Sequence, residues 1–338
     1  FQGGGYADAV SSGTAGIYIA VSVAGFHGSD IIVSPVTDPG AISAVILAGY
    51  SPIVADAAPD GFNVDVESLD QAVTSNTKVA LVTHVGGNPC NMPEITAWAR
   101  KKDIFLIEDC SQAHGASFEK EKVGNFGDIA VFSTMYSKNH ASGGSGGMVF
   151  TKNEEVYWKA RALADRGKPF KNALFDSKDP GQFLFPALNL NQDEISCAIG
   201  VSTLERLPLI IKKRCEIVKK IDEYMNDLLT VTPVAKTAQE KPSPFFHTVR
   251  VDCSKIRVNK VDFAKAVAAE GIWINPDYRY VVAEWEWIKP YLKEPCSTPR
   301  ATAFRNESFN ILFNERFSQD DIKDIICSIR KVEEAFMK

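Results

Sequence analysis

The sequence predicts an α/β fold: a large domain built on a mostly parallel sheet, followed by a smaller C-terminal α+β domain. Three observations support this prediction. Through the first two thirds of the 338 residues, short apolar runs alternate with longer helical stretches, the pattern of parallel strands joined by helices. The short runs are continuous in Val, Ile, Leu and Ala, as in strands covered on both faces. From residue 192 a long, charged helical stretch begins, and only short strand-like runs follow it.

Each element follows from its local pattern. Strands are expected over the apolar runs 6–11, 30–35, 52–56, 78–84, 104–109, 128–134 and 147–151, the last as a possible antiparallel edge strand. Helices are expected over 14–26, 40–49, 66–74 and 92–102. The second part should contain a helix over 192–229 kinked or broken at Pro208, a strand over 247–251, a helix over 261–270, a strand over 310–313 and an amphipathic helix over 319–337. We place the boundary near Leu207, which divides the chain into domains 1–207 and 208–338.

Composition excludes several classes of protein. The chain is 45% hydrophobic with a net charge of -5 and has no cluster of Lys and Arg, so no nucleic-acid partner is expected. No apolar run reaches the length of a membrane span, and no signal peptide is visible. Seven scattered cysteines and five histidines lack metal-ligand spacing, which favours free thiols in a reducing cytoplasm and no metal. The sequence begins at Phe1 without a methionine, and we expect residues to be missing upstream.

Two charged side chains follow apolar strands of the expected sheet. Lys138 comes soon after the run 128–134 and just before a glycine-rich loop, where a lysine can form a Schiff base. Asp109 ends the run 104–109, and ligands of α/β sheets bind beyond the C-terminal ends of strands. Each residue alone is also explained as a solvated lysine or a turn-capping acid. Together they predict the protein half of a pyridoxal phosphate (PLP) site, with Asp109 facing the pyridine nitrogen.

Ser12-Gly13-Thr14 lies where the first strand turns into the first helix. A helix N-terminus offers free N–H groups and a positive dipole end, which suit a phosphate, and glycine permits close approach. Ordinary N-capping by Ser12 explains the same residues. Glu108 should point away from the site, because side chains alternate along a strand.

These segments resemble the DegT/DnrJ/StrS family of PLP-dependent sugar aminotransferases. The matching pieces are Ser12-Gly13-Thr14, Glu108-Asp109-x-x-Gln112, Phe132-Ser133 followed by Lys138, Gly146-Gly147-Met148, Asn189, and Ala198-Ile199-Gly200 with Leu204 and Leu207. They occur in the family's order and cover nearly the whole chain. The resemblance implies a fold-type I aminotransferase with PLP as cofactor. It implies transfer of an amino group, from a donor such as glutamate, to a keto sugar or sugar nucleotide.

The resemblance also implies a role for each matching residue. Lys138 looks like the Schiff-base lysine and general base, and Asp109 like the partner of the pyridine nitrogen. Gln112 resembles the residue that packs near the ring and its hydroxyl. The remaining matches resemble the phosphate cradle: Gly13, Thr14 and Ser133 from the same chain, and Asn189, which reaches the phosphate of the neighbouring subunit. A homodimer is therefore expected.

The chain departs from the family pattern at three places. Asp38 stands where many members carry an aromatic residue that stacks on the ring, and Asn191 where many carry an arginine. The upstream segment that helps bind substrate is short or absent. Tyr278 lies where members place substrate-facing aromatics, although core packing is the commoner role of such a residue.

Three other functions remain open. A related branch of the family performs dehydration with a histidine in place of the lysine, which Lys138 argues against. A non-catalytic, PLP-binding regulatory protein is compatible with the changes at Asp38 and Asn191. A nucleotide-binding protein could use Ser12-Gly13-Thr14 for phosphate, but it would lack both GxxxxGK[ST] and GxGxxG and would leave Lys138 without a task.

Overall fold

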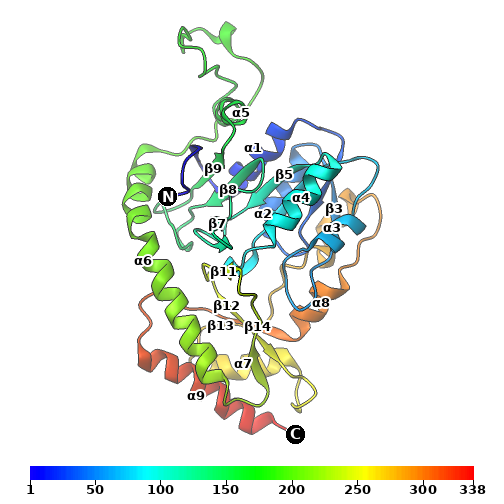
Figure 1. Ribbon diagram of the computed structural model, residues 1–338, viewed down its shortest axis with the longest axis vertical. Coiled ribbons are helices and arrows are strands. Elements are labelled where there is room, and N and C mark those ends of the chain that lie inside the picture. Colours follow the sequence, from blue (N-terminus) through cyan, green and yellow to red (C-terminus); the bar gives the residue numbers. More distant parts are fainter.

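The computed structural model describes residues 1–338, and its large domain is built on one seven-stranded sheet (Figure 1). In spatial order the strands are β1 (Tyr6–Val10), β9 (Gly147–Thr151), β8 (Ile129–Ser133), β5 (Phe105–Asp109), β4 (Thr77–Thr83), β2 (Asp30–Val33) and β3 (Ser51–Val54). Neighbours from β8 to β3 pair in parallel, and β9 runs against both of its neighbours. The mostly parallel α/β fold is confirmed.

Helices cover both faces of this sheet. They are α1 (Gly13–Ala24), α2 (Pro39–Leu47), α3 (Val66–Gln71), α4 (Met92–Lys102) and α5 (Glu154–Ala164). Ile31 and Val33 of β2 belong to the core under α1, α2 and α5, whereas Ile32 belongs to the core under α3 and α4. Each strand therefore buries alternate residues on opposite sides, which explains its continuous apolar run.

The small domain is an antiparallel sheet packed against helices. Its strands, in spatial order, are β10 (Val231–Pro233), β12 (His247–Val251), β14 (Ser308–Ile311) and β13 (Ile274–Asn275). Its helices are α6 (Glu194–Met225), α7 (Lys260–Ala269), α8 (Pro299–Asn306) and α9 (Gln319–Phe336). The second half of α6, α7, α9 and the sheet share one apolar core. No helix combines the length and apolar character that a membrane crossing would need.

The two domains are connected by a helix, a small sheet and a shared apolar cluster. Helix α6 runs from the large domain into the small one (Figure 1). A three-stranded sheet combines β11 (Glu240–Lys241) with β6 (Ser117–Phe118) and β7 (Glu121–Lys122) of the large domain. Val36 forms a bridge with Val281, and both belong to an apolar cluster shared by the two parts. The expected boundary at Leu207 falls inside α6 and stays a prediction.

Several expectations about elements need correction. Strand β9 is antiparallel, but it lies inside the sheet, because β1 pairs along its outer side and forms the edge. Helix α6 continues through Pro208 instead of breaking there, and Leu207 beside it is fully buried. The strand expected over 310–313 lies at β14, two residues earlier. Helices α5 and α8 were not expected, and neither were the short strands β6, β7, β10, β11 and β13.

Candidate active site

One cavity brings together six of the seven expected site residues. Its volume is about 250 Å³, and it lies at the N-terminus of α1 and beyond the C-terminal ends of β4, β5 and β8. It is lined by Ser12, Gly13, Thr14, Ile17, Thr37, Asp38, Ala41, Thr83, Asp109, Ser111, Gln112, Ser133, Met135, Lys138, Ser145 and Gly146. Asn189 does not line it. Thr83 was missed, although its place at the end of β4 could have revealed it by the strand-end rule.

The first turn of α1 forms one wall of the cavity. Ser12 is the N-cap, and its Oγ accepts a hydrogen bond from Ala15 N at 3.0 Å, so the capping expected from sequence is present. The N–H groups of Gly13 and Thr14 belong to the first turn of the helix, where no carbonyl lies one turn earlier to accept from them, so they remain available to a ligand. A Cβ on Gly13 would lie 2.8 Å from Ser133 Cβ, so only glycine allows this approach of α1 to the end of β8. Cap and phosphate cradle are therefore compatible.

Glu108 and Asp109 face opposite sides of the sheet, as expected. Asp109 Oδ1 accepts from Ser111 N at 3.0 Å within the cavity wall. Burial raises the pKa of Asp109, while its contact with Ser111 and the nearby Lys138 charge act in the opposite direction. A buried carboxylate with raised pKa is poised to accept a cationic partner such as a protonated ring nitrogen.

Glu108 is held by hydrogen bonds from the surrounding protein. Its Oε1 accepts from Phe126 N and Gly127 N, each at 2.8 Å, and its Oε2 accepts from Gly124 N at 2.8 Å. His84 Nε2 donates to Glu108 Oε2 at 3.2 Å, while His84 Nδ1 accepts from a backbone N–H. Both carboxylate oxygens are thus occupied by protein donors. The group that Glu108 and His84 form with Cys110 therefore holds the structure together and leaves no oxygen for a metal.

Lys138 reaches the cavity from the loop after β8. Burial lowers the pKa of Lys138, although the carboxylates of Asp109 and Asp38 act to raise it. No side-chain hydrogen bond or ion pair of its amino group is present. The amino group is therefore free to react and is more readily deprotonated than that of a solvated lysine.

Gln112 has a defined orientation. Gly86 N donates to its Oε1 at 2.7 Å, and its Nε2 donates to the Tyr278 hydroxyl at 3.2 Å. The Gln112 amide is therefore held in one orientation in the cavity wall. Tyr278 itself is 7% exposed and packs among aromatic side chains, so it acts from behind Gln112 and does not line the cavity.

Asp38 takes the place of the aromatic residue common in the family. It is exposed, lines the cavity, and caps α2 by accepting a hydrogen bond from Gly40 N at 2.8 Å. None of the residues that line the cavity is aromatic. A ring bound here would therefore be held by its polar substituents and by residues such as Thr83, without stacking on an aromatic side chain.

Asn189 lies outside the cavity on an exposed segment before α6. It forms a bridge with Asp165 and accepts a hydrogen bond from Asn191 Nδ2 at 3.0 Å. The segment between α5 and α6 extends away from the body at the top of Figure 1. Asn189 itself lies at the base of this segment, beside the end of α5, and does not line its own chain's cavity.

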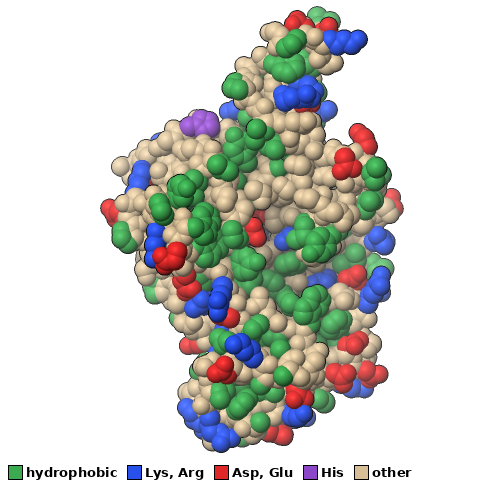
Figure 2. All heavy atoms as spheres, turned by 180° about the vertical axis from the view of Figure 1, so that it is seen from behind, with side chains coloured by type: hydrophobic (Ala, Val, Ile, Leu, Met, Phe, Trp, Pro, Cys, Tyr) green, Lys and Arg blue, Asp and Glu red, His purple; other side chains and the backbone are tan.

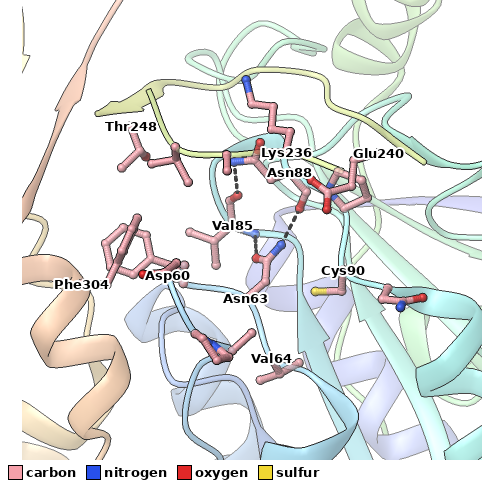
Figure 3. Close-up of a pocket in the computed structure, with 18 of the residues that line it drawn as sticks. Asp60, Asn63, Val64, Val85, Asn88, Cys90, Lys236, Glu240, Thr248 and Phe304 are labelled. Carbon is pink, nitrogen blue, oxygen red and sulfur yellow. Dashed lines mark hydrogen bonds between the residues drawn. The ribbon is translucent and has the colours of Figure 1, made fainter. Parts of the chain in front are cut away.

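A second cavity of about 230 Å³ lies between the domains (Figure 3). Asn63 forms part of its floor, accepting from Val85 N and donating to Asn88 O, each at 2.9 Å. None of the expected site residues lines it. The side-chain amides of Asn63 and Asn88 bond backbone groups of residues 85–88, so they hold the wall of this cavity in place.

The first cavity fits the three functional groups of PLP. The N-terminus of α1 can hold the phosphate, Asp109 can face the ring nitrogen, and Lys138 can join the aldehyde carbon. The wall is closely built: a Cβ on Gly147 would lie 2.5 Å from Ser12 O, at the same helix start. The residues present are therefore compatible with this cofactor.

Comparison with known proteins points the same way. A model of the DegT/DnrJ/EryC1/StrS aminotransferase family matches residues 1–330. The chain is 29% identical over 237 residues to the GDP-perosamine synthase of Escherichia coli O157:H7, which is 68% of this chain and 62% of the synthase. It is 30% identical over 289 residues to the GDP-4-keto-6-deoxy-D-mannose 3-dehydratase of Escherichia coli O55:H7, covering 79% of this chain and 73% of the dehydratase. An aminotransferase structure from Psychrobacter cryohalolentis has a TM-score of 0.91 at 25% identity, over 98% of this chain and 87% of that one.

Proposed function

The chain belongs to the DegT/DnrJ/EryC1/StrS aminotransferase family, and we propose that its active site is the cavity at the N-terminus of α1, with Lys138 as the lysine that binds the cofactor. By this membership the protein is a PLP-dependent transaminase that acts on keto sugars. The observation that supports the location is the meeting of Lys138, Asp109 and the α1 N-terminus in one cavity.

The residues divide the chemistry among them. When bound, the cofactor accepts the electrons released as the donor loses its α-proton. The Lys138 amine would take that proton and return it, and its lowered pKa suits a base at neutral pH. The Asp109 carboxylate keeps the ring nitrogen protonated. Gln112, fixed by Gly86, would lie beside the bound ring.

We propose glutamate as the amino donor and a keto sugar, free or as a sugar nucleotide, as the acceptor. The relative from Escherichia coli O157:H7 is named as a GDP-perosamine synthase, which supports a nucleotide-linked acceptor. One relative is a dehydratase. The lysine at 138 favours transamination, since the dehydratase branch carries histidine there, and His140 instead contacts Gly200 O at 2.9 Å.

We also propose that the enzyme is a homodimer that shares its active sites. Four apolar side chains on or before the first part of α6 are 40% or more exposed: Leu188, Ile195, Ile199 and Val201. Such a surface is typical of a protein interface. Hydrophobic side chains also gather around a hollow in the middle of the face shown in Figure 2. Asn189 adjoins the α6 surface and would reach the phosphate in the partner's cavity.

Borohydride reduction followed by peptide mapping tests the proposed site. Reduction fixes the cofactor to the lysine that carries it, and we expect the label on Lys138. Lys138→Arg should retain the fold but lose at least about 10³-fold in turnover, since a guanidinium neither joins the cofactor nor acts as the base. Label on another lysine would move the site. A labelled protein whose visible band does not respond to glutamate would instead be a non-catalytic cofactor-binding protein.

A further inference from the structure

The amino group of Lys138 has one close partner, and that partner is an aromatic ring. Nζ lies 4.5 Å from the centroid of Phe245, over the face of the ring. No hydrogen bond to Nζ is present, and no carboxylate lies within 4.0 Å of it. An ammonium group over a ring face is attracted by the ring quadrupole, more strongly where water is excluded. Phe245 is therefore the side chain that the structure places in contact with this amine.

Phe245 arrives from the C-terminal part of the chain on residues 242–246. This segment is bound to the large domain through a tight turn: Phe245 N donates to Gly86 O and Ser243 N to Gly87 O, each at 2.9 Å. Gly87 has a φ of +88°, and a Cβ there would lie 1.9 Å from Ser243 O. Only glycine admits segment 242–246 at this distance, so its position relative to the large domain is closely defined.

Two further side chains hold the same segment. Asn139, next to Lys138 and buried, donates through Nδ2 to Ser243 Oγ at 3.2 Å and to Pro244 O at 3.3 Å. Arg214 of α6 is 5% exposed, and donates through Nε to Pro244 O at 2.6 Å and through Nη2 to Phe245 O at 2.7 Å. The lysine loop and α6 are thus connected through segment 242–246.

We propose that Phe245 is a positioning residue for Lys138: its ring holds the ε-amino group whenever that group is not joined to the cofactor, and segment 242–246 sets the position of the ring. This inference rests on the proposed role of Lys138. A lysine that must leave and rejoin the reacting carbon in each cycle needs a defined resting place within reach. The ring of Phe245 supplies such a resting place. A carboxylate in contact with the amine would hold it more tightly than the ring does.

The other charges around Lys138 do not provide this resting place. Asp109 and Asp38 act on the amine from the cavity wall, but neither is in contact with it. Burial lowers the pKa of His114 to about 3, so this side chain carries no charge at neutral pH. Removal of the Phe245 ring should therefore have the most direct effect on the stability of the ammonium form of Lys138.

The test is the pH dependence with which cofactor-free enzyme attaches PLP to Lys138, followed by absorbance. The attachment rate rises as the amine deprotonates, so the midpoint of the rate-against-pH profile reports the pKa of Lys138. Phe245→Leu should lower the midpoint by about half a pH unit or more, because the ammonium loses the ring. Phe245→Tyr should leave it unchanged, and Phe245→Trp should keep or raise it. Phe263→Leu, in the fully buried core of the small domain, controls for lost packing alone.

The role of Phe245 and the proposed active site would be refuted by different results. If Phe245→Leu does not fold, Phe245→Met carries the same expectation with a flexible side chain, and thermal melting verifies the fold of each variant. Attachment at Lys138 with the same midpoint in the Phe, Leu and Met proteins would refute the role of Phe245 and leave the active site intact. Attachment elsewhere in the unaltered enzyme would refute the active site itself.

Discussion

Gln112 Nε2 donates a hydrogen bond to the Tyr278 hydroxyl at 3.2 Å, between residues 166 positions apart in the chain. Gln112 follows β5 of the large domain, whereas Tyr278 follows the small-domain strand β13. Tyr278 is buried, and burial raises the pKa of its hydroxyl, which therefore stays protonated. Of the two roles considered for Tyr278, the structure supports the core role: its ring packs in an apolar cluster and does not line the cavity, while its hydroxyl bonds Gln112, which does.

Tyr278→Phe should lower kcat/KM by roughly fivefold. The variant keeps the packing of the ring but removes the acceptor of Gln112 Nε2, a loss of about 1 kcal/mol. Steady-state kinetics and the absorbance of the bound cofactor measure the effect. Tyr280→Phe is the matched control, because the neighbouring ring is retained and its hydroxyl forms no hydrogen bond in the structure. Equal effects of the two substitutions would argue against the orienting role of Tyr278.

Asp109→Asn should lower turnover while stabilising the cofactor-free protein. Burial raises the pKa of Asp109, so its ionised form destabilises the folded apoenzyme, by about 1.4 kcal/mol for each pH unit of the shift. The stability gain of the variant should be absent below the ordinary pKa of a carboxyl and should develop as the pH rises through the raised pKa. Urea unfolding of both apoenzymes at several pH values measures it.

The catalytic side of the same substitution follows from the ring nitrogen. Asparagine keeps an acceptor for Ser111 N but removes the negative charge, so we expect turnover to fall by about 10²-fold or more. Kinetics with saturating PLP separate this loss from weaker cofactor binding. Unchanged turnover would make Asp109 a structural residue.

Glu108→Gln, one residue earlier, should lower stability, in contrast to Asp109→Asn, which should raise the stability of the apoenzyme. Its oxygens accept from three backbone N–H groups and from His84, so an amide nitrogen in place of one oxygen leaves a buried donor unpaired. We expect a loss of about 1–3 kcal/mol in the free energy of unfolding, with the visible band of bound cofactor retained. A variant as stable as the unaltered protein, with an altered band, would show that Glu108 acts on the cofactor.

Complementation between two inactive variants tests the shared site. Lys138→Arg should be inactive, and Asn189→Asp should bind the cofactor poorly because a carboxylate would face the phosphate. Mixed dimers contain one site with both changes and one intact site, so random pairing should restore roughly a quarter of the sites. Activity is measured after refolding the two proteins together and separately. Full activity of Asn189→Asp alone, or none in the mixture, would contradict the placement of Asn189 at the partner's site.

Much of the fold and of the candidate site could be predicted from local sequence. The apolar runs that became β2, β4 and β5 have both faces covered, because burial on two sides requires an uninterrupted apolar strand. The positions of Asp109 at a strand end and of Gly13 at a helix start follow from the same local patterns. Because parallel strands end at the same edge of the sheet, these residues were expected to meet, and they do.

The tertiary structure decided what local patterns do not encode. Strand β9 looks like an edge strand until β1 pairs beside it, and pairing between strands so far apart depends on the whole packing. Phe245 and Tyr278 lie more than 100 positions from Lys138 and Gln112, and only the docking of the small domain brings them into contact. Periodicity along a chain reports which face of an element is buried, whereas the partner on that face is selected by shape and by the hydrogen bonds that burial leaves to be satisfied.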